Sequence, residues 1–209
     1  MHMHRFAPAV IVALALAAVH ASFAVAAWAG APTEQIQQQV DAVVRLLDDP
    51  AFKDRPAERR ARVKKAAEEI FDYGDTARRA LGPHWNARTP QEREEFVRIF
   101  GDLLDRAYIS KIDLYQGEKV KYVGESIDGS EATVRTTIQS KSGRDIPVDY
   151  RMHLKDGRWL VYDVIIEGVS LVSNYRTQFN KVVQTESYEA LVQRLKERGA
   201  APAASPGRR

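Results

Sequence analysis

The 209-residue chain contains no cysteine, and its Lys and Arg residues outnumber its Asp and Glu residues by 31 to 28. The formal charge of +3 is too small for a nucleic-acid binder, whose affinity comes mainly from neutralising phosphates. The absence of cysteine excludes a disulfide framework and a thiol-based site. We therefore expect stability to come from packing, in one domain of about 170 residues with a sizeable core.

Residues 1–29 have the pattern of a secretory signal peptide. A short positively charged start precedes an apolar run over residues 6–19, and an A-x-A cleavage site ends at Ala29. The sequence thus predicts export to the periplasm, with residues 30–198 as a single mature domain. An uncleaved membrane anchor is the alternative, since about 20 apolar residues can span a bilayer. The polar His20 argues against it, because it interrupts the run.

The segment before residue 110 is predicted to be helical, because its apolar residues recur every three or four positions. We expect helices over residues 36–47, about 56–73 and about 75–81. A further helix should begin at Pro90, because Thr89 and Glu92 have the spacing of a capping box. The apolar side chains of this helix form a wide stripe: Phe96, Phe100, Leu103, Leu104, Ala107 and Tyr108.

From Lys119 onward the period of the apolar residues changes to two, which is typical of half-exposed strands. The pairs Asp128-Gly129 and Asp156-Gly157 have the composition of tight hairpin turns. We expect an antiparallel meander of four strands, over about 119–127, 131–140, 146–155 and 158–166. Two helices with apolar stripes over residues 172–183 and 188–195 follow the strands. The remaining segment, residues 199–209, lacks packing residues and is predicted to be disordered.

Helices before and after one antiparallel sheet predict an α+β fold in which the helices pack on one face of the sheet. The other face should be wet, and we expect His153 to be a solvated surface residue there, beside Arg135, Asp149 and Arg151. Strict alternation in the last strand predicts two apolar faces. One would carry Trp159, Val161 and Ile165, and the other Leu160, Tyr162, Val164 and Ile166.

The sequence contains few groups that could perform catalysis. Beyond the signal peptide the only histidines are His84 and His153, which lack the spacing of metal ligands or of a catalytic triad. No nucleotide-binding or nucleophile motif occurs. Asp163 and Glu167 could form an acid/base pair, but charge capping at a strand end is the simpler interpretation. We therefore predict no enzymatic activity, no cofactor and no metal.

The large apolar side chains could line a cavity between the sheet and the helices, or they could simply fill a core. The residues alone leave both interpretations open. The candidate lining residues are Phe96, Phe100, Leu103, Leu104, Tyr108, Val148, Tyr150, Met152, Leu154, Tyr162, Val164, Val172, Tyr175 and Phe179.

Two sequence blocks are more specific than these stripes. The first runs from Phe71 to Trp85 and continues from Thr89 to Phe96, and the second runs from Trp159 to Leu171 and continues from Asn174 to Phe179. Together they resemble the MlaC family, also called the toluene-tolerance family. The similarity follows the family order over about residues 33–195. It departs from the family in its generic first helix and in Gly74, which makes the end of the second helix unusual.

The resemblance implies a periplasmic carrier of phospholipid between an outer-membrane lipoprotein complex and an inner-membrane ABC transporter with an MCE subunit. It implies an α+β fold similar to nuclear-transport-factor-2-like (NTF2-like) domains, with acyl chains in an apolar pocket and the headgroup near its mouth. Because the hopanoid-associated branch has similar sequences, hopanoid or another lipid is an alternative ligand. An NTF2-like enzyme that uses Asp163 or Asp149 as base is a rival interpretation, and a lipid-free interaction protein is another.

The densest basic stretch, residues 55–65, is interleaved with Glu58. A solvated helix face explains it most simply, and a docking surface for an acidic partner or an anionic membrane is the alternative. A lipid with two long acyl chains needs roughly 20 kcal/mol of shielding to cross water, so a carrier must hand over its cargo directly. If the chain is a carrier, this stretch is the candidate docking surface.

Overall fold

The structure, a computed structural model, describes residues 31–109, 115–139 and 143–200, with the side chains of 198–200 left out. The predicted signal peptide and most of the predicted tail therefore lie outside the described residues. In the part of the chain that is described, no helix combines the length and the apolar character needed to cross a bilayer.

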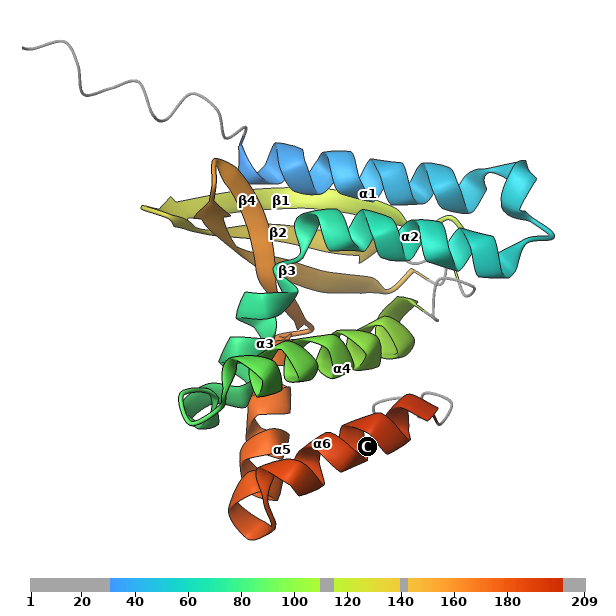
Figure 1. The fold of residues 1–209 in the computed structure, drawn as a ribbon. Helices are drawn as coiled ribbons and strands as arrows, with labels where there is room; N and C mark the ends of the chain where they lie inside the picture. The colour runs from blue at the N-terminus through green and yellow to red at the C-terminus, as the bar shows by residue number, and fades with distance from the viewer. Residues whose placement is uncertain (1–30, 110–114, 140–142, 201–209) are drawn as a thin grey trace, which may run out of the picture.

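The described residues form six α-helices, two 3-10 turns and one sheet (Figure 1). The helices are α1 (Pro32–Asp48), α2 (Pro56–Ile70), α3 (Tyr73–Leu81), α4 (Pro90–Tyr108), α5 (Leu171–Thr185) and α6 (Tyr188–Ala200). The 3-10 turns are η1 (Pro50–Phe52) and η2 (Gly82–Trp85). The strands are β1 (Lys119–Asp128), β2 (Glu131–Gln139), β3 (Asp145–Lys155), β4 (Arg158–Ile166) and β5 (Val169–Ser170).

The sheet is an antiparallel meander in the order β1-β2-β3-β4-β5, which confirms the predicted α+β class. It has one strand more than predicted. Glu167 and Gly168 both have positive φ, at 50° and 80°, and this turn brings β5 back alongside β4. A strand of two residues has no period, so the sequence pattern could not reveal it.

Helix α4 begins with the predicted capping box. The Thr89 hydroxyl accepts from the Glu92 N–H at 3.2 Å, and the Glu92 carboxylate accepts from the Thr89 N–H at 2.7 Å. Two otherwise unpaired donors at the helix start are thereby satisfied.

The break between α2 and α3 lies earlier than predicted, at Phe71 and Asp72. The Asp72 carboxylate accepts from the Asp75 N–H at 2.9 Å and so caps α3. The Asp72 N–H donates to the Val161 carbonyl at 2.9 Å, and Phe71 forms a parallel bridge with Val161. This pairing with β4 ends α2 at Ile70, which residue periodicity within one helix could not predict.

A β-bulge in β4 overturns the predicted faces of that strand. Arg151 pairs with Asp163 and Met152 pairs with Val161, so Tyr162 is an extra residue with no partner across the ladder. The bulge shifts the alternation by one. Val164 therefore lies on the same face as Val161 and joins the same core, contrary to the prediction.

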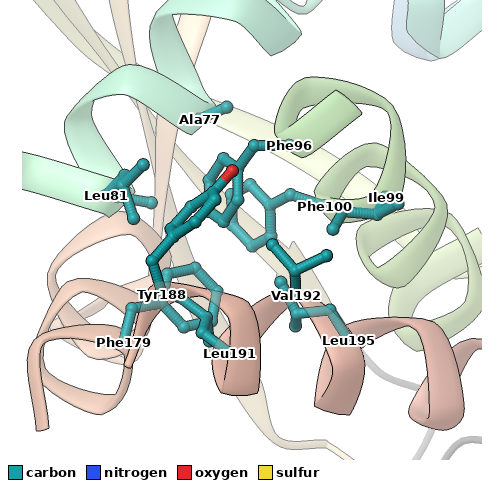
Figure 2. Close-up of a cluster of buried hydrophobic side chains, with 11 residues drawn as sticks. Ala77, Leu81, Phe96, Ile99, Phe100, Phe179, Tyr188, Leu191, Val192 and Leu195 are labelled. Atoms are coloured by element: carbon teal, nitrogen blue, oxygen red, sulfur yellow. The ribbon is translucent and has the colours of Figure 1, made fainter. Parts of the chain in front are cut away.

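The molecule has two hydrophobic cores. The sheet core joins α1 and α2 to one sheet face, and its buried members are Ile36, Ile70, Ala132, Val134, Met152, Trp159 and Val161. The helical core joins α3, α4, α5 and α6, with Phe96, Phe100, Phe179 and Tyr188 converging at its centre (Figure 2). In Figure 1, α1 and α2 lie along the sheet, while α4, α5 and α6 gather on the other side of the molecule. The two cores meet at β4, which contacts α2, α3 and α5.

Candidate functional site

A small apolar cavity lies where β4 meets α3, α4 and α5, between the two cores. It is lined by Phe71, Tyr73, Thr76, Phe100, Leu104, Tyr162, Asp163, Val164, Leu171, Val172 and Tyr175. The free volume inside is about 30 Å³, which is room for about one or two water molecules. The cavity is therefore too small to hold an acyl chain as it stands.

Six of the predicted lining residues do line this cavity: Phe100, Leu104, Tyr162, Val164, Val172 and Tyr175. Phe96, Leu103 and Phe179 pack in the helical core, while Met152 and Tyr150 pack in the sheet core. Val148 is buried opposite Ile166 of β4, and Tyr108 hydrogen-bonds to Tyr175. Leu154 lies outside the cavity, because the end of the β3–β4 hairpin leaves 39% of its surface exposed.

The sequence analysis missed several lining residues because of where they lie in the chain. Phe71, Tyr73 and Thr76 surround the α2–α3 break, and Leu171 is the first residue of α5. A periodic stripe identifies side chains within one element, so residues at junctions between elements carry no such signal.

Aromatic rings form the wall between the cavity and the helical core. The ring of Phe100 lies edge-on to those of Tyr175 and Phe179, with centroids 5.1 and 5.2 Å apart. Phe96 meets Phe179 in the same way at 5.7 Å (Figure 2). Each such pair contributes about 0.5–1.5 kcal/mol beyond the area it buries, so this wall holds its shape.

Burial keeps the hydroxyls of Tyr73 and Tyr108 neutral. The Tyr73 hydroxyl donates to Asp105 at 3.1 Å, and burial raises the pKa of Tyr73. Burial likewise raises the pKa of Tyr108, whose hydroxyl interacts with that of Tyr175. These two hydroxyls can therefore offer hydrogen bonds near the cavity without themselves placing a charge beside an apolar ligand.

The Asp163 carboxylate has three partners in the fold. It accepts from the Ser170 hydroxyl at 2.6 Å and from the Val172 N–H at 3.0 Å, and Arg151 lies 3.5 Å away. Only 4% of Asp163 is exposed. It therefore fixes the start of α5 against β4 (Ser170 is the N-cap residue). Glu167, beyond the end of β4, pairs instead with Arg144, so the two carboxylates do not act as a pair.

The similarity to known proteins extends over most of the chain. The family model for MlaC protein matches residues 37–197. The chain belongs to the MlaC family. Its fold matches that of the phospholipid-binding protein from Ralstonia solanacearum, solved in complex with a phospholipid, with a TM-score of 0.73 and 26% identity. That match covers 82% of this chain and 98% of the other.

Two curated relatives match a smaller part of this chain than the Ralstonia solanacearum protein does. The intermembrane phospholipid transport system binding protein MlaC of Haemophilus influenzae is 22% identical over 130 residues, 59% of this chain and 60% of the relative. The toluene tolerance protein ttg2D of Pseudomonas putida is 26% identical over 97 residues, 46% of this chain and 45% of the relative. The matches thus span less than two thirds of either relative.

The first block that resembles the MlaC family builds a polar cluster outside the cavity. Asp72 accepts from Lys155 at 2.8 Å, and His153 lies 3.2 Å from Asp72 and 3.6 Å from Asp75. Burial opposes ionisation of Asp72, but hydrogen bonds from Lys155 and the Asp75 N–H outweigh it and lower its pKa. His153 packs on the Tyr162 ring with 18% of its side chain exposed, so the prediction of a solvated residue was wrong. Helix α3 covers it.

The predicted basic stretch lies on α2. Most of its residues are exposed, and several have acidic neighbours: Glu58 lies 2.9 Å from Arg55 and 3.6 Å from Arg62. Lys64 lies 2.6 Å from Asp105, an ion pair that joins α2 to α4. Among the residues that the structure describes, no cluster of His, Cys, Asp and Glu is arranged to hold a metal.

Proposed function

We propose that this protein carries a phospholipid through the periplasm, with the acyl chains held between the sheet and the helical core. One observation supports this most strongly: the apolar cavity at β4 lies in a fold shared with a phospholipid-bound protein over 98% of that protein's length. The transport partners would be an outer-membrane lipoprotein complex and an inner-membrane ABC transporter with an MCE subunit. The name of the Haemophilus influenzae relative, an intermembrane phospholipid transport system binding protein, supports a role between two membranes.

The small cavity must expand to hold an acyl chain. A volume of about 30 Å³ is far too small for a long chain. Because the sheet core and the helical core are separate clusters, the two can move apart at β4 while each remains packed. Burying an acyl chain contributes about 0.8 kcal/mol per methylene, so a chain of about 16 carbons offers roughly 12 kcal/mol to offset the opening.

The same geometry argues against the enzyme alternative. The Asp163 carboxylate at the cavity wall is occupied by Ser170 and Val172 of the α5 start, and by the nearby Arg151. Asp149 lies on the opposite face of its strand from Tyr150, which packs in the sheet core. We therefore infer binding without a reaction.

The test is organic extraction of gently purified mature protein, followed by mass spectrometry. We expect phospholipid at about one molecule or more per protein, since water would otherwise face the apolar chains. Hopanoid in place of phospholipid would change the identity of the cargo but would still support the function of a lipid carrier. Extracts without lipid, from protein that also accepts none from vesicles, would contradict the proposal.

A second measurement addresses export. The intact mass of the protein recovered from the periplasm should correspond to a chain that begins near Gly30, because the predicted cleavage site ends at Ala29. A recovered mass that includes residues 1–29 would favour the membrane-anchor alternative.

A further inference from the structure

A second concave region, separate from the cavity, lies at the surface between α3, η2 and α5. This arginine cleft has a volume of about 270 Å³ and is lined by Arg78, Arg79, Gly82, Trp85, Asn86 and Arg176. Three of these six residues are arginines, and none is a carboxylate. The cleft shares no lining residue with the cavity. Helices α3 and α5 thus line both spaces, with uncharged residues at the cavity and cations at the cleft.

Asp75 holds two of the three guanidinium groups in place. Its carboxylate accepts from Arg78 Nε at 2.8 Å and from Arg79 Nε at 2.6 Å. The Arg79 guanidinium also lies over the Tyr162 ring, 3.8 Å from its centroid. Arg79 Nη2 also donates to Glu131 at 3.4 Å, but the Nη1 groups of Arg78 and Arg79 have no acceptor among the described residues, so each arginine keeps a donor for a ligand.

Arg176 supplies the third guanidinium, and it makes no hydrogen bond or ion pair with any described residue. Its aliphatic stem packs on the backbone of Gly82. A Cβ at Gly82 would lie 3.3 Å from Arg176 Cδ, and the φ of Gly82 is +59°. Glycine thus allows both the turn into η2 and the close approach of this arginine. The result is an unpaired cation beside two fixed ones.

We propose that the arginine cleft binds a phosphate-class anion, either a free phosphate or the phosphate of a lipid headgroup. Guanidinium groups form planar forks that pair with phosphate oxygens two at a time. Inorganic phosphate offers four oxygens to the three arginines, whereas a carboxylate offers only two; a lipid phosphodiester has two unesterified oxygens on a tetrahedral phosphorus. The Asn86 amide and the Trp85 ring complete the wall of the cleft. The proposal stands on this geometry and does not require lipid in the cavity.

The test is NMR of the mature protein titrated with sodium phosphate at constant ionic strength. The indole N–H of Trp85 reports on the cleft, and that of Trp159, 5% exposed in the sheet core, is an internal reference. We expect a saturable shift at Trp85 and none at Trp159. Sodium acetate should give a much weaker response, and an equal response would overturn the assignment to phosphate.

Matched variants locate the site. Arg176→Gln should weaken phosphate binding at least fivefold, and Arg78→Gln is a second variant with an exposed side chain. Arg98→Gln on α4 makes the same charge change at a residue 65% exposed outside the cleft, and should bind like the parent. Equal losses in Arg176→Gln and Arg98→Gln would overturn the site, because a general charge effect would explain both.

A second arm distinguishes the two sources of phosphate. Sedimentation with phosphatidylglycerol vesicles should be weakened by Arg176→Gln and not by Arg98→Gln if the ligand is a lipid headgroup. If phosphate shifts the Trp85 signal but Arg176→Gln binds vesicles as well as the parent does, the ligand of the cleft is free phosphate. If Trp85 shows no saturable shift and vesicle binding does not depend on Arg176, the proposal is rejected.

Discussion

Individual polar residues connect the two cores of this protein. Asp163 is buried at their junction, where it binds the start of α5 from β4. Asp72 caps α3 and also accepts from Lys155 of β3. Both carboxylates replace hydration with several fixed donors, so loss of either leaves buried donors without partners.

Replacement of Asp163 by Ala should therefore lower the free energy of unfolding by about 2–4 kcal/mol, because the Val172 N–H and the Ser170 hydroxyl lose their acceptor. Urea denaturation followed by circular dichroism measures the change. Glu167→Ala, which removes an exposed ion-pair partner, is the control and should cost less than about 1 kcal/mol. Similar losses in both variants would show that Asp163 has no special structural role.

Stability should also depend on acid pH through Asp72 and Asp75. Burial opposes the ionisation of both, but hydrogen bonds from Lys155 to Asp72, and from Arg79 and Arg78 to Asp75, lower each pKa below its ordinary value. Their contribution is thus present above the unfolded-state pKa of about 4, and is lost as the pH falls through the lower folded-state values. Unfolding free energies of the parent and Asp72→Asn should converge at low pH; a difference that stays constant from neutral to acid pH would contradict this.

Whether the predicted lining residues contact lipid stays a prediction, but their positions are most accurate where the signal lies within one element. Phe100, Leu104, Val172 and Tyr175 lie within helical stripes, and all four line the cavity. His153 was misplaced because its partners lie in α3, about 80 residues earlier in the chain. Distances of this kind depend on how the elements pack, which no local pattern contains.

At the scale of elements, the turns and caps were the most predictable features. The hairpin turns and the capping box have fixed compositions. The structure confirms the capping box and the turn at Asp156-Gly157, but the first hairpin turns at Gly129-Ser130, because Asp128 is still paired with Glu131 in the ladder. The bulge at Tyr162 was not predictable, because one extra residue leaves the composition of β4 unchanged. Strand β5 and the break at Phe71 arise from pairing with β4, so they also lacked a local signal.

The capping box of α4 provides a test at this scale. Thr89→Ala should lower the free energy of unfolding by about 1 kcal/mol, because the Glu92 N–H loses its acceptor. The control is Thr185→Ala, which removes a hydroxyl bonded to a carbonyl of its own helix near the end of α5. Chemical denaturation should rank Thr89→Ala as the more destabilised variant, and the reverse order would contradict the capping account.

The basic residues of helix α2 are predicted to form a docking surface. Exposed charge sets the rate and register of encounter between proteins, so reversing Arg59, Arg60 and Arg62 to Glu should slow lipid transfer to transporter-bearing membranes. The effect should shrink as salt rises, while bound lipid stays unchanged. The matched control reverses three cations on α4 and α6: Arg98, Arg194 and Lys196. If the triple variant transfers lipid at the same rate as the parent at low salt, α2 is a solvated helix face and not a docking surface.

At the scale of the whole molecule, the separation into two cores explains how one domain can hold a lipid and remain folded. The sheet core and the helical core each bury their own apolar residues, and the cavity lies between them. The sequence predicted the α+β class and the meander correctly. It did not predict the division of the helices between two cores, because the stripe of a helix does not specify which element covers it.

The most direct test of the lipid-carrier account compares two identical substitutions. Leu104→Gln places an unpaired amide in the cavity wall, at a cost of about 1–3 kcal/mol against bound acyl chain. Leu154→Gln makes the same change at an exposed position outside the cavity. We expect phospholipid per protein, measured on folded samples, to fall clearly in Leu104→Gln and to match the parent in Leu154→Gln. Equal lipid content in the two variants would contradict the assignment of this cavity to the acyl chains.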